Sequence, residues 1–537
     1  MRIRDLVREN IVNLEPYNSL RDKVDKFVNI LLDANESPFN NGYNRYPDSQ
    51  SKKLRVAYSN LSGVPVDNLF AGNGSDEIID LIIRVFCEPG KDGIVCLSPS
   101  FGMYKTWATI NNIKCVEVTL KEDFTLCADD LFKKIDSDSK IVFLCSPNNP
   151  SGNLLDKKEI VQIIKRFNGI VVIDEAYIDF SEEMGFALDV RKFRNLIVLR
   201  TLSKAWGMAG LRVGFAMASN EIIRYLNRVK PPYNIGILSQ EKAIELIKKG
   251  NSGYVRSIIS ERERLREGLI ALPSVIKVYP SQSNFLLVKF SNHEVIHKML
   301  LNNGVIVRDI TNINGSKGYL RITVGSVSEN NLLLNLLNGT LKEVSVQFVE
   351  KTRSTKETNV SVRLDPSGIM DSEIFTGISF FDHMLEQMPV HSGLSIRILV
   401  KGDIQNGPHH TIEDIAIVLG DALNELLTLS FGNRRYGFSL PMDESSSTVM
   451  LDFCNRACLT WDVQFPVPFV ENIESDMFRH FFDTLSKSMK ATFNIKTSGT
   501  NSHHMVESIF KAFAKSLKMM LDDSRRGQKI ISSKGSL

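Results

Sequence analysis

A pair of adjacent histidines followed three residues later by a glutamate occurs twice in the last third of the chain, at 409–413 and 503–507. On a helix, the first histidine and the glutamate of each set project from one face, and the second histidine stands beside them. A further histidine precedes each set, at positions 383 and 480. Neutral imidazole and carboxylate groups suit divalent cations such as manganese, iron, cobalt, nickel or zinc. The pattern predicts a two-metal site built by an internal repeat.

The alternative is that these histidines are only structural, as a lone histidine on an apolar helix face commonly is. Their distribution argues against this, because seven of the nine histidines lie beyond residue 380 and all but one of those seven follow the repeated pattern. Each set is also followed by an apolar run with helical spacing, at 415–426 and 509–521. The expected ligands are His383, His409, His410, Glu413, His480, His503, His504 and Glu507.

Length and composition limit the class of protein. At 537 residues the chain is too long for one core, so two or three domains are expected. A net charge of only +3, without blocks of basic residues, argues against a nucleic-acid partner. No apolar run reaches the ~20 residues that span a membrane, and the charged N-terminus lacks a signal-peptide core. The seven cysteines form no C-x-x-C pair, which favours reduced thiols and a cytoplasmic location.

The first 340 or so residues alternate short β-like runs with longer helical patterns, and these elements must position the reactive side chains. This alternation is typical of an α/β fold with a mostly parallel sheet. A buried strand at 169–173 ends at Asp174, the place where open α/β sheets bind ligands. Lys204 follows another strand and precedes a glycine-rich segment. A lysine there could lie on the surface, but together with Asp174 it fits a Schiff-base lysine and its cofactor-orienting acid.

A glycine-rich turn at 72–77 opens an amphipathic helical segment. The backbone N–H groups and the positive end of a helix dipole at such a turn can hold a phosphate. Ser75 and Asp76 could equally serve as ordinary helix caps.

Ordered motifs across this region resemble the fold-type I pyridoxal-phosphate (PLP) aminotransferases, in particular histidinol-phosphate aminotransferases. They are Asn35-Glu36, Asn44-Arg45-Tyr46-Pro47, Phe101-Gly102-Met103-Tyr104, Ser146-Pro147-Asn148-Asn149-Pro150-Ser151-Gly152, Asp174-Glu175-Ala176-Tyr177, Thr201-Leu202-Ser203-Lys204 with Gly210-Leu211-Arg212, and Leu320-Arg321-Ile322-Thr323-Val324-Gly325. The resemblance covers about 10–340 and implies a large, mostly parallel sheet domain with a small α+β domain.

The resemblance also implies roles for single residues. Lys204 forms the Schiff base with PLP and later shuttles a proton, while Asp174 pairs with the ring nitrogen. Asn149 and Tyr177 hydrogen-bond the ring oxygen O3′, and Tyr104 stacks on the ring face. The residues implied in phosphate binding are Ser75, Asp76 through its backbone, Ser203, Arg212 and, in support, Thr201.

Two arginines, Arg308 and Arg321, are implied to grip the anionic end of the substrate, whether a carboxylate or a phosphate ester. The alternative is a solvated surface pair. Tyr46 is implied to reach into the site of a neighbouring subunit, because the sites of this family form at a dimer interface. A homo-oligomer is therefore expected.

A new β-rich pattern begins after a polar turn at 338–340, and we place the domain boundary between 342 and 343. The second domain, 343–537, is expected to be a duplicated α+β unit with repeats at about 345–430 and 431–525. Its motifs resemble imidazoleglycerol-phosphate dehydratase over the whole length. They are Arg353-Ser354-Thr355-Lys356-Glu357-Thr358, Phe381-Asp382-His383-Met384-Leu385, His409-His410-Thr411-Ile412-Glu413-Asp414, Met442-Asp443-Glu444, His480-Phe481-Phe482, His503-His504 with Glu507, and Ile531-Ser532-Ser533-Lys534-Gly535.

That family uses two manganese ions, bound by residues that match the eight expected ligands. The resemblance implies that Glu357, Gln387 and Lys511 lie near the reacting carbons, and we count Glu413 and Glu507 as catalytic as well as ligating. The residues implied for the substrate phosphate are Arg435, Arg456, Ser532 and Lys534. Two departures stand out: Gly407-Pro408 replace a common pair of aspartates, and Asn494 replaces a common histidine. The absence of the two aspartates could weaken the orientation of the metal ligands.

The two resemblances together imply a bifunctional enzyme of histidine biosynthesis. The C-terminal domain would dehydrate imidazoleglycerol phosphate to imidazole-acetol phosphate. The N-terminal domain would transaminate that ketone, with glutamate as donor, to L-histidinol phosphate. Two alternatives stay open: an aminotransferase of broader substrate range, and a C-terminal half that is a catalytically degenerate assembly module.

Overall fold

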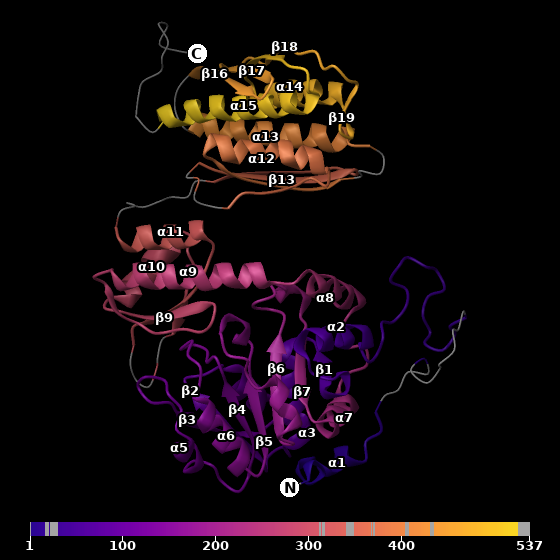
Figure 1. The fold of residues 1–537 in the computed structure, drawn as a ribbon, viewed down its shortest axis with the longest axis vertical. Coiled ribbons are helices and arrows are strands. Elements are labelled where there is room, and N and C mark those ends of the chain that lie inside the picture. Colours follow the sequence, from indigo (N-terminus) through magenta and orange to yellow (C-terminus); the bar gives the residue numbers. More distant parts are fainter. Residues whose placement is uncertain are drawn as a thin grey trace. The chain divides into compact units, whose positions relative to one another are not determined.

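The computed structural model describes residues 2–16, 21, 30–310, 313, 317–339, 348–366, 368, 371–402, 407–429 and 434–524. The chain divides into two compact units, Met1–Gly325 and Ser326–Leu537 (Figure 1). The boundary predicted at 342–343 lies outside the described residues and stays a prediction. Within the described part of the chain, no helix is long and apolar enough to cross a membrane.

Seven strands form the large sheet of the first unit, in the order β1-β7-β6-β5-β4-β2-β3. Their bounds, from β1 to β7, are Leu69–Gly72, Gly93–Ser98, Lys114–Thr119, Ser139–Cys145, Ile170–Asp174, Leu196–Thr201 and Gly214–Ala218. Only β7 runs antiparallel to its neighbours, so the mostly parallel sheet predicted from the sequence is confirmed.

Helices cover both faces of this sheet, which explains why its central strands are almost continuously apolar. On one face, Val142 and Leu144 of β4 belong to the same core as Ile163 of α6. On the other face, Ile141 of β4 belongs to a second core with Ile82 of α3. The α-helices of this part are α1 (Glu9–Val12), α2 (Lys52–Ser62), α3 (Gly74–Phe86), α4 (Met103–Ile110), α5 (Ala128–Phe132), α6 (Lys157–Arg166), α7 (Asn220–Val229) and α8 (Ile237–Lys249).

A smaller antiparallel sheet completes the first unit, in the order β10-β11-β9-β8. Helices α9 and α10 pack against it (Figure 1). The bounds are α9 (Ser252–Ile270), β8 (Val275–Val278), β9 (Phe285–Phe290), α10 (His293–Asn302), β10 (Arg308–Ile310) and β11 (Tyr319–Thr323). The predicted small α+β part is therefore confirmed.

After α11 (Val327–Leu337), the second unit runs through one order of elements twice: three strands, a helix, a strand and a helix. The first pass is β12 (Val349–Ser354), β13 (Thr358–Asp365), β14 (Glu373–Phe375), α12 (Ser379–Ser392), β15 (Ser395–Gly402) and α13 (His409–Leu429). The second is β16 (Arg434–Met442), β17 (Ser445–Phe453), β18 (Cys458–Asp462), α14 (Ser475–Met489), β21 (Thr492–Ser498) and α15 (Ser502–Ser524). A short hairpin, β19 (Phe469–Val470) with β20 (Ile473–Glu474), is added before α14.

The two sheets of this unit also pair alike, as β12-β13-β15-β14 and β16-β17-β21-β18. The four helices lie between them (Figure 1). Helix α12 packs on α15 and α13 packs on α14, so each contact joins the two repeats. Phe381, Phe481 and Phe510 meet at the centre, with ring centres 5.2 Å apart for Phe381 and Phe481 and 5.6 Å for Phe481 and Phe510. One core spans both repeats, so neither repeat can bury its apolar face alone.

The contact between α13 and α14 depends on Gly420. A Cβ added there would lie 2.6 Å from the Cβ of Ser488 and 3.0 Å from the backbone nitrogen of Met489. Glycine is unfavourable inside a helix by about 1 kcal/mol relative to alanine. Its presence on α13 therefore reflects the close approach of the helices.

We expect Gly420→Ala to destabilise the protein, because the two helices must separate to admit the methyl group. The clash should exceed the gain in helix propensity and leave a net loss of about 1–3 kcal/mol. Urea unfolding followed by circular dichroism measures this loss. Asp421→Ala, at the neighbouring exposed position of α13, is the matched control and should not destabilise. An equal effect of both changes would contradict the role of the close approach.

Candidate active sites

The carboxyl ends of three adjacent parallel strands line a cavity in the first unit. Cys145, Asp174 and Thr201 are the last residues of β4, β5 and β6. The cavity encloses about 490 Å³, including the part open to solvent. The other lining residues are Ser75, Asp76, Phe101, Asn149, Ala176, Tyr177, Ser203, Lys204 and Arg212.

Asp174 lies at the base of this cavity and is 3% exposed. Burial raises the pKa of its carboxyl group to about 6, against the lowering effect of its hydrogen bonds. Oδ2 accepts a hydrogen bond from the Tyr104 hydroxyl at 2.8 Å, and Oδ1 accepts one from the backbone N–H of Ala176 at 3.1 Å. A cationic ring nitrogen in the cavity would favour the ionised form of this acid.

Lys204 reaches the same cavity, with Nζ 5.6 Å from the centre of the Tyr177 ring. Burial, followed by the charge of Arg321, lowers the pKa of the Lys204 ammonium group. A lowered pKa increases the neutral amine present near pH 7, and the neutral amine is the form that attacks a carbonyl.

The amino-terminal end of α3 forms one wall together with Arg212. Arg212 Nη2 lies 3.2 Å from Asp76 Oδ2, and a Cβ added at Gly74 would lie 2.6 Å from the same Nη2. Gly74 has a φ of +76°, so a side chain there would be both strained and in the way. Thr201 Oγ1 accepts a hydrogen bond from the Ser203 backbone N–H at 3.1 Å.

The donors in this wall fit a phosphate group. They comprise a helix amino-terminus, hydroxyl groups and a guanidinium group, the set that binds phosphate elsewhere. The cavity therefore brings together all the predicted cofactor residues except Tyr104.

The stacking role predicted for Tyr104 is wrong. Tyr104 is fully buried beneath the cavity, where it stacks on Phe143 at 4.8 Å and donates its hydroxyl to Asp174. Phe101, which the sequence reasoning missed as a site residue, lines the cavity instead. Both aromatic residues stand in one motif at the start of α4, and the sequence alone does not tell which ring faces outward.

The two predicted substrate arginines lie directly opposite each other on β10 and β11. Arg321 is half-buried and donates a hydrogen bond from Nη1 to Asn149 Oδ1 at 2.5 Å, while Arg308 is exposed. Like charges at directly opposed positions destabilise a sheet. Such a pair is suited to binding an anion beside Asn149, at the edge of the cavity.

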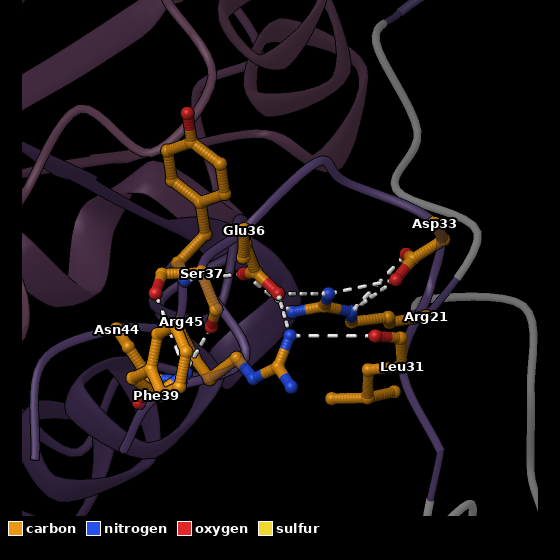
Figure 2. A network of polar contacts seen from close by, with 9 residues as sticks. Arg21, Leu31, Asp33, Glu36, Ser37, Phe39, Asn44 and Arg45 are labelled. Carbon is orange, nitrogen blue, oxygen red and sulfur yellow. Dashed lines mark hydrogen bonds and ion pairs between the residues drawn. The ribbon is translucent and has the colours of Figure 1, made fainter. Parts of the chain in front are cut away.

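Tyr46 lies outside the cavity, 52% exposed and stacked on Tyr233 at 4.5 Å. Its loop is held by Glu36, which Figure 2 shows between Arg21 and Arg45. Glu36 accepts from Arg21 at 2.7 Å, from Arg45 at 2.8 Å and from the Tyr46 backbone N–H at 2.6 Å. These bonds, chiefly that of Arg21, lower the pKa of the Glu36 carboxyl group to about 2.

The predicted metal ligands of the second unit form two groups of three. In each group, one ligand atom per residue lies within 4.8 Å of the others: His383, His503 and Glu507 in the first, and His409, Glu413 and His480 in the second. In the second, His409 and His480 Nε2 atoms lie 3.9 Å and 3.8 Å from carboxylate oxygens of Glu413. In the first, His503 Nε2 lies 3.8 Å from Glu507 Oε2.

Each group mixes the two repeats. His383 on α12 joins His503 and Glu507 on α15, whereas His480 on α14 joins His409 and Glu413 on α13. This exchange follows from the packing of α12 on α15 and of α13 on α14.

The chemistry of both groups fits a divalent metal. His480 Nε2 is buried and, within the described residues, has no hydrogen-bond partner. A buried imidazole nitrogen left unpaired is costly unless it binds something. Two imidazoles and one carboxylate supply a donor set for manganese or a neighbouring metal. Glu507 also forms an ion pair with Lys511 at 2.8 Å, which places that predicted catalytic lysine beside the first group.

The remaining two histidines, His410 and His504, lie outside both groups. His410 Nδ1 is 3.2 Å from Glu357 Oε2, and His504 Nδ1 is 2.9 Å from Glu444 Oε2. Glu357 and Glu444 occupy the corresponding β12–β13 and β16–β17 turns, so the repeat includes these acids too. The sequence reasoning missed Glu444 as a site residue, although its position opposite the second His-His pair repeats that of Glu357.

The remaining predicted site residues of the second unit do not belong to the two groups of metal ligands. Gln387 lies one turn after His383 and donates to its carbonyl oxygen at 3.1 Å. Arg435 pairs with Asp452 at 2.9 Å on the outer face of its sheet, in a shallow groove that also contains Asn494. Arg456 is exposed in the turn before β18. Within one chain, Arg435 therefore faces away from the helices that carry the metal groups. Ser532 and Lys534 lie outside the described residues.

The departure at Gly407-Pro408 has a local structural role. Gly407 has a φ of +107°, and the carbonyl oxygen of Pro408 accepts the first helical hydrogen bond, from Ile412 N–H at 3.0 Å. These residues turn the chain into α13. The helix that they start then holds the ligands His409 and Glu413 in place. In the other repeat, Asn501 Oδ1 accepts from the His503 backbone N–H at 2.9 Å.

Comparisons with known proteins match each part of the chain to a family. Residues 9–337 match the family model of aminotransferase class I and II, and residues 376–517 match that of imidazoleglycerol-phosphate dehydratase. The histidinol-phosphate aminotransferase of Parabacteroides distasonis is 49% identical over 62% of this chain and 98% of its own length. That of Flavobacterium psychrophilum is 44% identical over 62% and 98%.

Solved structures agree with the fold of the first unit. Histidinol-phosphate aminotransferase from Clostridium acetobutylicum has a TM-score of 0.51 and 26% identity, over 55% of this chain and 90% of its own. The enzyme from Sinorhizobium meliloti, in complex with pyridoxal-5′-phosphate, has a TM-score of 0.50 and 20% identity, over 55% and 82%.

The chain belongs to the class I and II aminotransferase family. Its first unit is similar to histidinol-phosphate aminotransferases, and its second unit carries an imidazoleglycerol-phosphate dehydratase domain. The combination is that of a bifunctional enzyme of histidine biosynthesis, as the sequence motifs predicted.

We expect His480→Ala to lose one of two bound manganese ions per chain, because it removes one of three ligands from the second group. The loss of affinity should exceed the roughly 10–100-fold that follows removal of an outer-shell partner. His391→Ala, on α12 but outside both groups, is the matched control and should retain both ions. Metal analysis after dialysis measures the ratio.

We expect Glu36→Gln to loosen the loop that carries Tyr46, because a neutral amide cannot hold two guanidinium groups. Limited proteolysis should cut the 30–47 region faster, with Glu15→Gln, at an exposed position, as the control. The lowered pKa of Glu36 means that its contribution is present above an ordinary glutamate pKa of about 4.3 and is lost as pH falls toward 2. Unchanged cleavage would contradict this role of Glu36.

Proposed function

We propose that the second unit dehydrates imidazoleglycerol phosphate to imidazole-acetol phosphate and that the first unit transaminates this ketone with glutamate to L-histidinol phosphate. The product of one reaction is then the substrate of the other. The observation that carries the proposal is the presence of two chemically different sites in one chain: Lys204 with Asp174 in one cavity, and two groups of metal ligands.

Pyridoxal phosphate is the cofactor proposed for the first unit, where it supplies a carbonyl for Lys204 and an electron-accepting ring. Asp174 holds the ring nitrogen in its protonated form, and Phe101 covers a ring face. Asn149 and Tyr177 donate to the ring oxygen. The phosphate is held by the amino-terminus of α3 with Ser75, Asp76, Thr201, Ser203 and Arg212. The Lys204 amine, with its lowered pKa, would take a proton from the substrate Cα and deliver it to C4′ of the cofactor.

Arg308 and Arg321 bind the anionic end of the substrate. Their direct opposition on β10 and β11 is relieved by a carboxylate or phosphate between them. Arg321 also hydrogen-bonds Asn149. The residue that binds the anion and the residue that contacts the cofactor ring are therefore held in a fixed position relative to each other.

Two manganese ions per chain are proposed for the second unit, where they supply charge that stabilises an anionic imidazole ring during proton loss. Dehydration removes a proton from one carbon and a hydroxyl group from the next, so the unit needs both a base and an acid. Glu357, Glu507 and Lys511 carry protons within this site, and Glu413 and Glu507 also ligate. Gln387 orients the turn of α12 that carries His383. The substrate phosphate is bound by Arg435, Arg456, Ser532 and Lys534.

Both sites gain groups from further copies of the chain. Three protein ligands leave coordination positions open in each of the two metal groups. Exposed His410 and half-buried His504 lie outside these two groups, and His504 lies beside the carboxylates of Asp443 and Glu444. We propose that the two histidines complete the groups of neighbouring copies, and that Tyr46 likewise enters a neighbouring cavity. A homo-oligomer follows. A cytoplasmic location is supported by the seven free cysteines, the state that a reducing compartment maintains.

A broader amino-acid substrate range is the second candidate for the first unit, since Arg308 and Arg321 can bind a carboxylate as well as a phosphate. A degenerate second unit is disfavoured, because both ligand groups form despite the Gly407-Pro408 departure.

We expect the protein, supplied with pyridoxal phosphate and manganese, to form one 2-oxoglutarate for each imidazoleglycerol phosphate consumed in the presence of glutamate. Lys204→Ala should block the transamination and let imidazole-acetol phosphate accumulate, because no amine remains to attack the cofactor. His409→Ala should block the dehydration, yet the variant should still transaminate imidazole-acetol phosphate that is supplied directly. Coupled dehydrogenase assay of 2-oxoglutarate and chromatography of the phosphates measure both steps. Equal turnover of phenylpyruvate would favour the broader range, and no loss of imidazoleglycerol phosphate would contradict dehydration.

A further inference from the structure

Tyr104 has the least accessible polar group around the cavity of the first unit. It is fully buried, and its ring lies between Phe143, stacked at 4.8 Å, and Phe101, whose ring meets it edge-on at 5.5 Å. Its hydroxyl group points at Asp174 Oδ2, 2.8 Å away. A buried hydroxyl left unpaired is costly, so this bond ties the position of the tyrosine oxygen to that of the acid, beside the Cys145 thiol.

The direction of the bond follows from the protonation states. Burial, followed by the nearby Asp174 charge, raises the pKa of the Tyr104 phenol well above its usual range, so Tyr104 remains a donor. The same burial raises the pKa of Asp174 to about 6, and the Tyr104 hydrogen bond opposes that rise. Hydrogen bonds to a charged acceptor are stronger than neutral ones. The tyrosine therefore stabilises the ionised carboxylate against its desolvation.

The other groups that face Asp174 do not replace this bond. Asp76 on α3 raises the pKa of Asp174, and Lys204, after β6, lowers it by charge. Cys145 at the end of β4 stays a neutral thiol, because burial raises its pKa. The Ala176 backbone N–H binds Oδ1, the other oxygen. Tyr104 is thus the side-chain donor that holds Oδ2.

We propose that Tyr104 is a positioning residue that keeps Asp174 ionised and aimed at the cofactor ring nitrogen. It acts through Asp174 and does not touch the substrate. This inference rests on the proposed pairing of Asp174 with the pyridoxal-phosphate ring.

The inference is tested on the full-length protein stripped of cofactor, by titrating pyridoxal phosphate and following visible absorbance. We expect Tyr104→Phe to weaken binding roughly tenfold or more at pH 7.5, the loss of one hydrogen bond to a charged group. Tyr225→Phe, which removes the hydroxyl of another buried tyrosine, on α7 and outside the cavity, should bind as the parent does. Parent affinity in Tyr104→Phe would overturn the inference.

A double-mutant cycle separates action through Asp174 from general packing. In the Asp174→Asn background, Tyr104→Phe should change affinity less than twofold, because no charge remains to be stabilised. Phe143→Leu loosens the packing of the Tyr104 ring but keeps its hydroxyl, and should weaken binding less than Tyr104→Phe. An equal loss in both backgrounds, or a larger loss in Phe143→Leu, would assign Tyr104 a packing role instead.

The pH dependence supplies a second readout. Asp174 must be ionised to pair with the ring, so cofactor affinity falls as pH drops through its folded pKa. Without the Tyr104 hydroxyl that pKa rises, and the acid limb should move upward by about one unit. An unmoved limb would overturn the inference. If the parent protein binds no pyridoxal phosphate at all, the proposed function of this cavity fails instead.

Discussion

The reactive groups of this protein stand where buried apolar elements end. An apolar strand or helix packs along its length, but its last backbone groups and the turn that follows must meet polar partners. Asp174 ends a strand buried on both faces. His409 and His503 stand in the first turns of helices whose later turns enter the common core. The apolar part holds each reactive group in place, and the end of the element exposes it.

This arrangement makes burial itself part of the chemistry. Desolvation raises the pKa of the Asp174 carboxyl group and lowers that of the Lys204 ammonium group, so both move toward the range of catalytic acids and bases. The neighbouring hydrogen bonds then decide how far each shift goes. In the metal groups, Glu507 is buried beside Lys511, whereas Glu413 is only half-buried and has Ile417 at the matching position. The duplicated ligands therefore sit in unequal surroundings.

Exchange between repeats is the second organising feature. Because α12 packs on α15 and α13 on α14, each metal group needs both halves of the second unit to be folded. A single repeat has only part of the core, and it supplies one ligand of one group and two ligands of the other. In the proposed oligomer, exposed His410 and Tyr46 and half-buried His504 would likewise contribute to the sites of neighbouring copies.

The sequence alone predicted the class of fold, which the structure confirms. It also predicted a cofactor lysine with its acid, which line one cavity, and eight metal ligands, six of which the structure brings into two groups. These are encoded locally, because strand ends, glycine-rich turns and histidines at helical spacing are visible in short windows. Tertiary structure alone decided that the upstream histidine of one repeat joins the His-x-x-x-Glu pair of the other, since that depends on which helices pack. It also decided that Phe101 lines the cavity while Tyr104 turns under it to Asp174. Two aromatic residues three positions apart lie near the same helical face, and only the packing against β4 and β5 distinguishes the ring that faces the cofactor from the one that supports the acid.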